Sequence, residues 1–491
     1  MGSTEKAPSD LFDVIIVGAG IAGINAAYRL QTEIPSANFT ILEARGGIGG
    51  TWDLFNYPGF RSDSDLYTFG FSWRPWPGDK CIADGDSIRK YIRASAAMYG
   101  IDQKVQFHHR LVAANWSSDQ QAWTLLIDKD GHEARFHARF VILSTGYYDY
   151  EEALSSHITG IENFKGTVLH PQFWPNDFDY KDKKMVVVGS GSTAVTLLPS
   201  LAETASHVTM LQRSPTYIIS RPSVDPFGAW VHKFLPSAMA HRITRIKFLL
   251  FGFLFIKFCA FYPLAARNLI KKVTVKELPE DVPHDPHFEP RYNPWEQRLC
   301  LCPDGDFFKA MRSGKASVVT DTITTVTATG IQLASGKHID TDIIITATGL
   351  KLKIGGGAQI TVDNVPQTVG EKYLWKGVML QDVPNMATCL GYTNVAWTLG
   401  VDATAILVAR LLNSMKKRGI TSAVPRLEKG ADMKTVTALN LSSTYVVKGA
   451  KAVPKAGDKA PWLPRITYLA DLWDAEYGNI VDGLHFEKVS T

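Results

Sequence analysis

Short apolar runs alternate with stretches of helical periodicity along much of this chain. Residues 14–17 and 185–188 are each four consecutive apolar side chains, which is typical of strands buried on both faces of a parallel sheet. After the first run, Ala26, Ala27 and Leu30 recur at helical spacing. The alternation predicts an α/β fold in which β–α–β units build parallel sheets.

The same pattern predicts further elements between and after these two units. Residues 104–143 alternate in the manner of strands and end in a buried run at 140–143. We also expect an amphipathic helix at 86–99, strands at 207–211 and 339–346, and a long helix at 398–417. From Ala423 on the pattern weakens, and Trp462 and Trp473 are expected to anchor a C-terminal segment.

A glycine-rich turn, Gly18-Ala19-Gly20-Ile21-Ala22-Gly23, lies between the first apolar run and its helix. In a dinucleotide-binding turn, Gly18 permits the tight turn, Gly20 lets a pyrophosphate approach the backbone, and Gly23 lets helix and strand pack closely. Glu43 ends the next strand, where its carboxylate can accept hydrogen bonds from ribose hydroxyls. Strand, turn, helix and acid together favour a nucleotide site over a glycine turn without a ligand.

A second unit repeats this spacing with different chemistry at its end. Gly189-Ser190-Gly191-Ser192-Thr193-Ala194 opens the helix after the run 185–188. The interval from Gly18 to Glu43 is 25 residues, and that from Gly189 to Arg213, which Ser214 follows, is 24. An arginine can neutralise a 2′-phosphate but cannot accept from a ribose hydroxyl. We therefore predict FAD at the first unit and NADPH at the second; a surface arginine at a strand end is the alternative for Arg213.

Residues 225–300 interrupt the β–α pattern with helical, aromatic and proline-punctuated sequence. Within them, residues 248–266 are apolar except for Lys257, a length close to that of a membrane span. Because a charge, Gly252 and Pro263 lie inside the run, we favour a buried or substrate-lining helix and keep weak interfacial membrane contact as the alternative.

The predicted architecture is thus two Rossmann-like dinucleotide-binding domains with a helical insertion in the second. The expected order is the FAD domain, the NADP domain, the insertion, and then the remainder of each domain. The corresponding residues are 1–155, 156–224, 225–300, 301–335 and 336–491, the last including the C-terminal wrap.

Composition narrows the class of protein further. Of 491 residues, 20% are charged and 45% hydrophobic, as in an ordinary globular enzyme. The net charge is only +4 and the longest basic cluster is Lys416-Lys417-Arg418, so no nucleic-acid partner is expected. Five scattered cysteines predict neither a metal site nor disulfides, and residues 1–10 are polar. A cytoplasmic, reducing location fits these features best.

Two longer motifs resemble one enzyme family. Residues 164–175, Phe-Lys-Gly-Thr-Val-Leu-His-Pro-Gln-Phe-Trp-Pro, resemble the FxGxxxHTxxWP fingerprint of type I Baeyer–Villiger monooxygenases, with Pro171 in place of threonine. The stretch from Gly49 to Asp63, with Gly50, Thr51 and Trp52 at its start, matches the family's second motif. Residues 60–65 and 292–301 are most similar to the family's ethionamide-activating subgroup. The resemblance covers nearly the whole chain.

The resemblance implies a reaction and roles for single residues. Such enzymes use NADPH and O₂ to insert one oxygen next to a ketone carbonyl through a C4a-peroxyflavin, giving an ester or lactone, and they also oxidise sulfides. By the family motif, Arg298 supplies the fixed positive charge and Asp63 positions it. Gly50, Thr51 and Trp52 belong to the FAD site. For His170 we favour a structural role at the domain link over proton transfer.

Other functions share parts of this pattern. A flavin-containing N- or S-monooxygenase acting only on soft nucleophiles would not need Arg298, because its oxygen transfer requires no attacking anion. A disulfide reductase has the same two-nucleotide layout but needs a cysteine pair near the flavin, and none follows the first unit. A non-catalytic membrane-associated protein rests on residues 248–266 alone.

Overall fold

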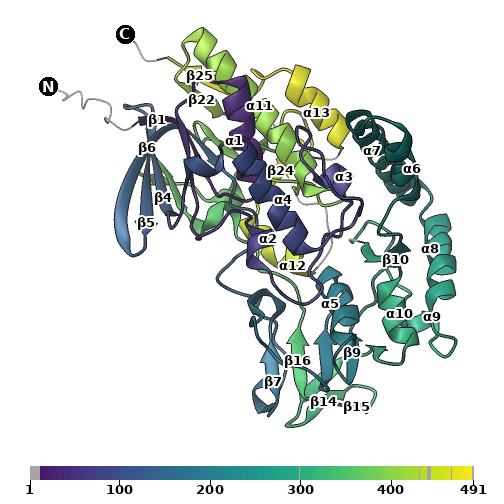
Figure 1. Ribbon diagram of the computed structural model, residues 1–491. Coiled ribbons are helices and arrows are strands. Elements are labelled where there is room, and N and C mark those ends of the chain that lie inside the picture. Colours follow the sequence, from purple (N-terminus) through teal and green to yellow (C-terminus); the bar gives the residue numbers. More distant parts are fainter. Residues whose placement is uncertain are drawn as a thin grey trace.

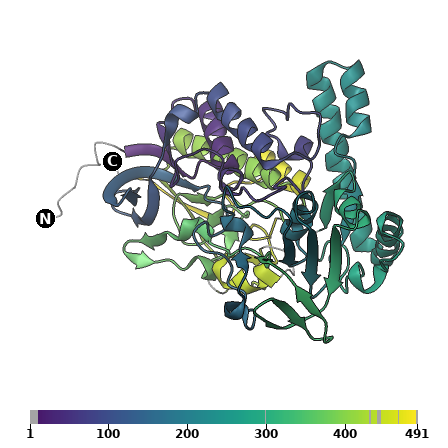
Figure 2. The ribbon, with the colours of Figure 1, turned by 60° about the horizontal axis from the view of Figure 1, so that its bottom comes forward.

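The computed structural model describes residues 11–297, 299–428, 430, 432–438, 444–465 and 467–488, with the backbone alone at 444–446. Two β-sheets, a mixed one and a parallel one, lie one above the other in Figure 1, and a layer of helices runs along one side of both. Figure 2 shows the same helical layer projecting beyond the sheets. The chain therefore has the expected α/β architecture with two sheet-based domains and a helical insertion.

The first sheet carries the first glycine turn at the ends of its central strands. Its main path follows the order β18-β17-β4-β5-β6-β1-β2-β3. In this path β18 is Val365–Pro366, β17 is Gln359–Val362, β4 is Arg110–Ser117, β5 is Ala122–Lys129 and β3 is Val105–Gln106. The strands beside the turn are β1 (Leu11–Val17), β2 (Phe39–Leu42) and β6 (His132–Leu143). Val17 pairs with both Leu42 and Leu143, so these parallel strands end at one edge. Ligands of open α/β sheets bind at this carboxyl-terminal edge.

The second sheet repeats the arrangement with five strands in the order β12-β9-β8-β16-β7, all parallel. Its strands are β7 (Thr167–Leu169), β8 (Lys184–Val188), β9 (His207–Gln212), β12 (Ala316–Thr320) and β16 (Ile343–Thr346). The strand expected at 339–346 is in fact two. β15 (His338–Asp340) pairs with β14 (Gly330–Leu333), whereas β16 pairs with β8.

The chain returns to the first sheet later than the predicted boundary at residue 336. Because β16 still belongs to the second sheet, the first strand to rejoin the large sheet is β17 (Gln359–Val362), which runs parallel to β4 (Arg110–Ser117). Residues 347–358 are therefore the second crossing between the domains.

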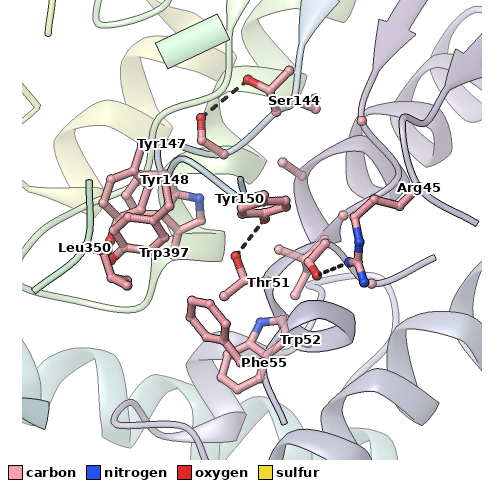
Figure 3. A pocket seen from close by; sticks show the side chains of 18 of the residues that line it. Arg45, Thr51, Trp52, Phe55, Ser144, Tyr147, Tyr148, Tyr150, Leu350 and Trp397 are labelled. Carbon is pink, nitrogen blue, oxygen red and sulfur yellow. Dashed lines mark hydrogen bonds between the residues drawn. The ribbon is translucent and has the colours of Figure 1, made fainter. Parts of the chain in front are cut away.

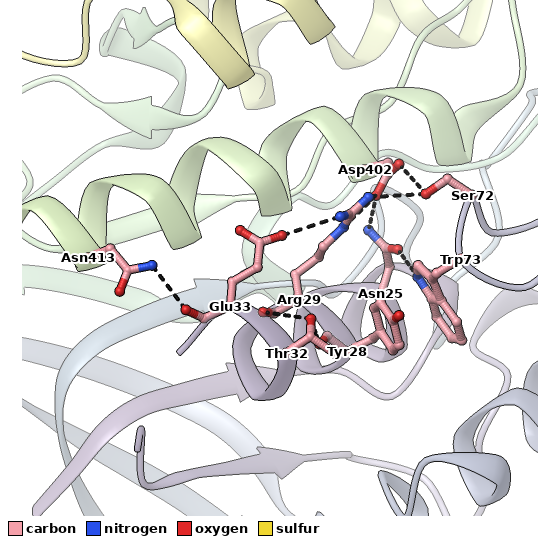
Figure 4. A network of polar contacts seen from close by, with 9 residues as sticks. All are labelled: Asn25, Tyr28, Arg29, Thr32, Glu33, Ser72, Trp73, Asp402 and Asn413. Atoms are coloured by element: carbon pink, nitrogen blue, oxygen red, sulfur yellow. Dashed lines mark hydrogen bonds and ion pairs between the residues drawn. The ribbon is translucent and has the colours of Figure 1, made fainter. Parts of the chain in front are cut away.

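Helices α1 (Ile21–Glu33), α4 (Gly85–Met98) and α11 (Trp397–Arg418) match their predicted positions. α1 and α11 pack on each other, and a buried polar cluster joins them (Figure 4). Near the C-terminus, Trp462 is buried as predicted. The prediction for Trp473 is wrong, because this residue lies on α13 (Tyr468–Tyr477) with 67% of its surface exposed.

The insertion contains α6 (Pro226–Phe234), α7 (Ser237–Phe261) and α8 (Pro263–Glu277). The apolar stretch 248–266 is not one helix, since α7 and α8 meet at Tyr262 with a bend of 115°. Among the described helices none is long and apolar enough to cross a membrane by itself. The bent pair α7–α8 taken together has the length and apolar composition of a span. A buried helix is also wrong for α7, in which Ala240, Thr244 and Cys259 are the buried residues.

Candidate functional site

The first glycine turn has the close contacts that its sequence predicts. Gly18 has φ +104°, and a Cβ there would lie 2.6 Å from the carbonyl oxygen of Ser144. A Cβ on Gly23 would lie 1.9 Å from the carbonyl oxygen of Gly18, so helix and strand could not pack this closely with any other residue. Gly20 has room for a Cβ, with Gly50 Cα at 3.5 Å. The protein itself therefore requires glycine at positions 18 and 23 but not at 20, where the absence of a side chain would let a pyrophosphate approach the backbone.

Glu43 is buried beside this turn, and both carboxylate oxygens accept backbone hydrogen bonds. Ala19 N–H donates to Oε2 at 2.7 Å and Arg45 N–H donates to Oε1 at 2.9 Å. Burial raises the pKa of Glu43, while the two N–H groups oppose that rise. Each oxygen keeps a further lone pair. Glu43 is therefore held in place and can still accept hydrogen bonds from ribose hydroxyls.

A cavity of about 340 Å³ runs from this turn to the second domain. The loop around Gly50, Thr51 and Trp52 forms part of its wall, and Thr51 and Tyr150 hydroxyls hydrogen-bond at 2.9 Å (Figure 3). Trp52 stacks on Phe60 with ring centroids 5.0 Å apart. The three residues predicted from the family motif thus line one cavity together with Gly18, Gly20 and Glu43.

A second group of aromatic side chains, Tyr147, Tyr148 and Trp397, also lines the cavity and lies at the left of Figure 3. Tyr147 stacks on Trp397 with centroids 4.3 Å apart and planes at 17°. Trp397 is the first residue of α11, so the N-terminus of that helix borders the cavity. Burial raises the pKa of nearby Tyr150 to about 12, which keeps its hydroxyl neutral. Sequence reasoning missed these residues, although a cluster of three tyrosines directly after the turn 144–146 was a usable signal.

The second glycine turn is more open than the first. Gly189 has φ +140°, and a Cβ there would lie 2.2 Å from the carbonyl oxygen of Ala347. At Gly191 a Cβ would meet no described atom within 4 Å, which leaves space for a ligand. Arg213 follows β9 directly and is exposed, and within the described ranges no carboxylate pairs with it. Its neighbour Ser214 accepts a hydrogen bond from Ser190 Oγ through its carbonyl oxygen at 2.8 Å.

The two domains meet at Asp63. Ser192, the first residue of α5 (Ser192–Ala202), donates from Oγ to Asp63 Oδ2 at 3.2 Å. Ser192 and Thr193 line the same cavity as Glu43, so the start of the second unit's helix borders the predicted FAD site. Ser192 Oγ also lies 3.8 Å from Cys300 Sγ in β11 (Cys300–Pro303). Asp63 is thereby linked to the strand that begins two residues after Arg298; Arg298 itself lies outside the described residues.

A larger cavity of about 630 Å³ adjoins the first one at Asp63 and Ser64, which line both. Trp295 and Leu299 form part of its wall, as do aromatic side chains of α7 such as Phe255. α7 therefore lines a cavity, and the further expectation that this cavity takes substrate stays a prediction.

His170 stabilises the local backbone. Its Nδ1 accepts a hydrogen bond from the backbone N–H of Gln172 at 3.2 Å, capping the short helical turn 171–173. Burial lowers the pKa of His170, so its imidazole is neutral at pH 7. These contacts agree with a structural role. No cluster of three His, Cys, Asp or Glu side chains suited to a metal ion occurs in the part of the chain that the structure describes.

Comparisons with known proteins give consistent results. The profile of the flavin-binding monooxygenase-like family matches residues 69–244, and that of an NAD(P)-binding Rossmann-like domain matches residues 16–76. The FAD-containing monooxygenase EthA of Mycobacterium tuberculosis is 46% identical over 478 residues, covering 97% of this chain and 98% of that protein.

Two solved structures share the fold. One, of an oxidized steroid monooxygenase bound to NADP, has a TM-score of 0.74 at 20% identity and covers 97% of this chain and 100% of its own. The other, of OTEMO in complex with FAD and NADP, has a TM-score of 0.72 at 20% identity and covers 98% and 100%. At such identities the likeness shows the two-domain fold alone.

Proposed function

This chain belongs to the family of FAD-containing monooxygenases, and on that premise we propose that it is an NADPH- and O₂-dependent enzyme that inserts one oxygen next to a ketone carbonyl. The product is an ester or lactone, and thioethers are further substrates. When bound, FAD accepts hydride from NADPH and in its reduced form activates O₂. The remaining chemistry rests on side chains that bind, orient and exclude water.

The first glycine turn and Glu43 would hold the adenosine diphosphate part of FAD. Gly20 has room at the pyrophosphate position, and Glu43 has lone pairs for the ribose. Thr51, Trp52 and the Tyr147–Trp397 stack would enclose the ring system. The N-terminus of α11 would place a positive dipole end near a reduced, negatively charged ring.

The second glycine turn would hold NADPH. The open space at Gly191 suits the pyrophosphate, and the exposed guanidinium of Arg213 suits the 2′-phosphate. Ser192 and Thr193 lie at the N-terminus of α5, where backbone N–H groups bind anions.

The hydrogen bond between Ser192 and Asp63 is the observation that carries the proposal. It joins the start of α5, which would hold NADPH, to the cavity that would hold FAD, so Ser192 and Thr193 would border both cofactors. It also connects Asp63 to the strand after Arg298. We propose that Arg298 supplies the positive charge that stabilises negative charge on oxygen during insertion, and that Asp63 positions it.

The test supplies purified, FAD-loaded protein with NADPH, O₂ and either a linear ketone or a thioether. Ester formation from the ketone, identified by mass spectrometry, is the expected result. Sulfoxide formation without any ester, over ketones of several lengths, would instead favour a monooxygenase of soft nucleophiles. A protein that is colourless and gains no activity from added FAD would contradict both functions.

A further inference from the structure

The helical insertion combines an apolar surface with a strong excess of positive charge. Residues 226–276 contain nine lysines and arginines and no aspartate or glutamate. The whole chain has 52 Lys+Arg against 48 Asp+Glu, so the remainder of the protein would carry a net charge of −5 without this segment. Over the whole insertion, residues 225–300, eleven lysines and arginines stand against seven aspartates and glutamates, so the surplus of four positive charges in the insertion equals the net charge of the entire chain.

Large apolar side chains of this segment face solvent. We use the name insertion face for the exposed surface of α6, α7 and α8 formed by six side chains that are 48–72% exposed. They are Trp230, Ile246, Leu250, Leu254, Phe261 and Leu264. Figures 1 and 2 show these helices on the outside of the molecule, away from both sheets. Apolar surface that is exposed and contiguous generally marks an interaction site.

The exposed positions on α7 form a continuous stripe. Arg242, Ile246, Leu250, Leu254 and Lys257 follow one another at intervals of three or four residues, so they share one face of the helix. Basic side chains thus stand at both ends of an apolar centre. Lysine and arginine beside leucine and aromatic residues are also the composition of segments that lie in a membrane interface.

We propose that the insertion face docks the enzyme on a membrane surface that contains anionic lipids. The apolar side chains would enter the boundary between headgroups and acyl chains, and the basic side chains would contact lipid phosphates. The 115° bend at Tyr262 suits helices that lie in the interface rather than span the bilayer. Docking would place the larger cavity, which is lined by α7 residues such as Phe255 and Lys257, close to the membrane surface.

Charge makes the lipid surface a better partner than a second copy of this chain. In a symmetric dimer through this face, each basic insertion would meet the other, and like charges at such an interface repel. An anionic membrane complements the same charges. Each basic residue near such a surface strengthens binding about fivefold at moderate salt, and the effect falls as salt rises.

The experiment measures co-sedimentation of the FAD-loaded protein with vesicles of phosphatidylcholine alone or with about 30% phosphatidylglycerol. We expect binding to the anionic vesicles that weakens at high salt. The double variant Leu250→Asp with Leu254→Asp should reduce that binding at least tenfold. Neither residue lines the larger cavity, so turnover of a water-soluble substrate should not change. Far-UV circular dichroism verifies that the variants are folded.

Matched controls place equal changes elsewhere on the surface. Met98→Asp with Val365→Asp alters two side chains of similar exposure, 63% and 59%, and should leave vesicle binding intact. Arg242→Glu with Lys272→Glu should weaken binding at least tenfold, whereas Lys129→Glu with Lys315→Glu, which changes net charge equally, should have a smaller effect.

Three results would overturn the proposal. They are failure to bind anionic vesicles, equal binding by the Leu250/Leu254 variant and the wild type, and conversion of a dimer to a monomer by that variant in sedimentation velocity. The last result would assign the insertion face to contacts between copies of the chain.

Discussion

Substitution of Asp402 should measure how much the polar network between α1 and α11 contributes to the free energy of unfolding (Figure 4). Its Oδ1 accepts from Arg29 Nη2 at 2.9 Å and from Asn25 Nδ2 at 3.3 Å, and its Oδ2 accepts from Ser72 Oγ at 2.8 Å. The side chain of Asp402 is 7% exposed and that of Arg29 is 20% exposed. One buried carboxylate of α11 thus satisfies two donors of α1 and one from the loop at Ser72.

The expected loss of unfolding free energy in Asp402→Ala depends on Arg29, which would stay largely buried without its ion-pair partner. Breaking a buried ion pair on one side costs about 3–5 kcal/mol, because the remaining charge stays buried without its partner. Arg29 retains some contact with water and with Glu33, so we expect about 3 kcal/mol. Asp402→Asn keeps the shape and some hydrogen bonds and should cost about 1–2 kcal/mol.

The assay is urea unfolding of the purified protein followed by circular dichroism. The control is Glu133→Ala, which removes an ion pair to Arg135 in which both side chains are more than half exposed, at 58% and 68%. Exposed pairs contribute less than about 1 kcal/mol. If Asp402→Ala shifts the unfolding midpoint no more than Glu133→Ala does, the buried network is not a major source of stability.

Four further outcomes are expected. Arg213→Ala should raise the KM for NADPH about ten- to a hundredfold, since it removes one charge-assisted contact, and an unchanged KM in steady-state assays would reassign that arginine. In the Arg298→Ala variant, NADPH should still reduce the flavin, but the rate of ketone oxygenation should fall by about 10²–10³-fold. Stopped-flow absorbance with product analysis measures both steps, and a normal ester yield would assign the catalytic role to another residue. Gly23→Ala should destabilise the protein itself, whereas Gly20→Ala should fold and lose FAD, as measured by melting temperature and flavin absorbance. The lowered pKa of His170 means that the unfolded chain takes up this proton first, so stability falls as pH drops below the unfolded value near 6.5. His170→Asn replaces the Nδ1 acceptor with an amide oxygen that can still cap the turn, and urea unfolding at about pH 7.5 and about pH 5.5 should show a smaller loss of unfolding free energy than in the wild type.

The sequence by itself determined those features that depend only on residues close to one another along the chain. Both glycine turns, Glu43 after the first unit and Arg213 after the second could be located because β–turn–α–β spacing is short and local. The bounds of α4 and α11 followed from helical periodicity for the same reason. Chemical differences at matched positions were enough to predict two different nucleotides.

Only the tertiary structure decided which distant residues meet. Asp63 and Ser192 are 129 residues apart, and their contact depends on how the two domains pack. Tyr147 and Trp397 stack across 250 residues, a pairing that no local spacing indicates. Trp473 was expected to be an anchor, yet it is exposed, and the apolar stretch of α7, expected to be buried or to line a substrate site, also leaves Leu250 and Leu254 largely exposed. A hydrophobic pattern reports that a side chain favours burial, but whether another element covers it depends on the whole fold, because burial is a property of the packed chain and not of the residue.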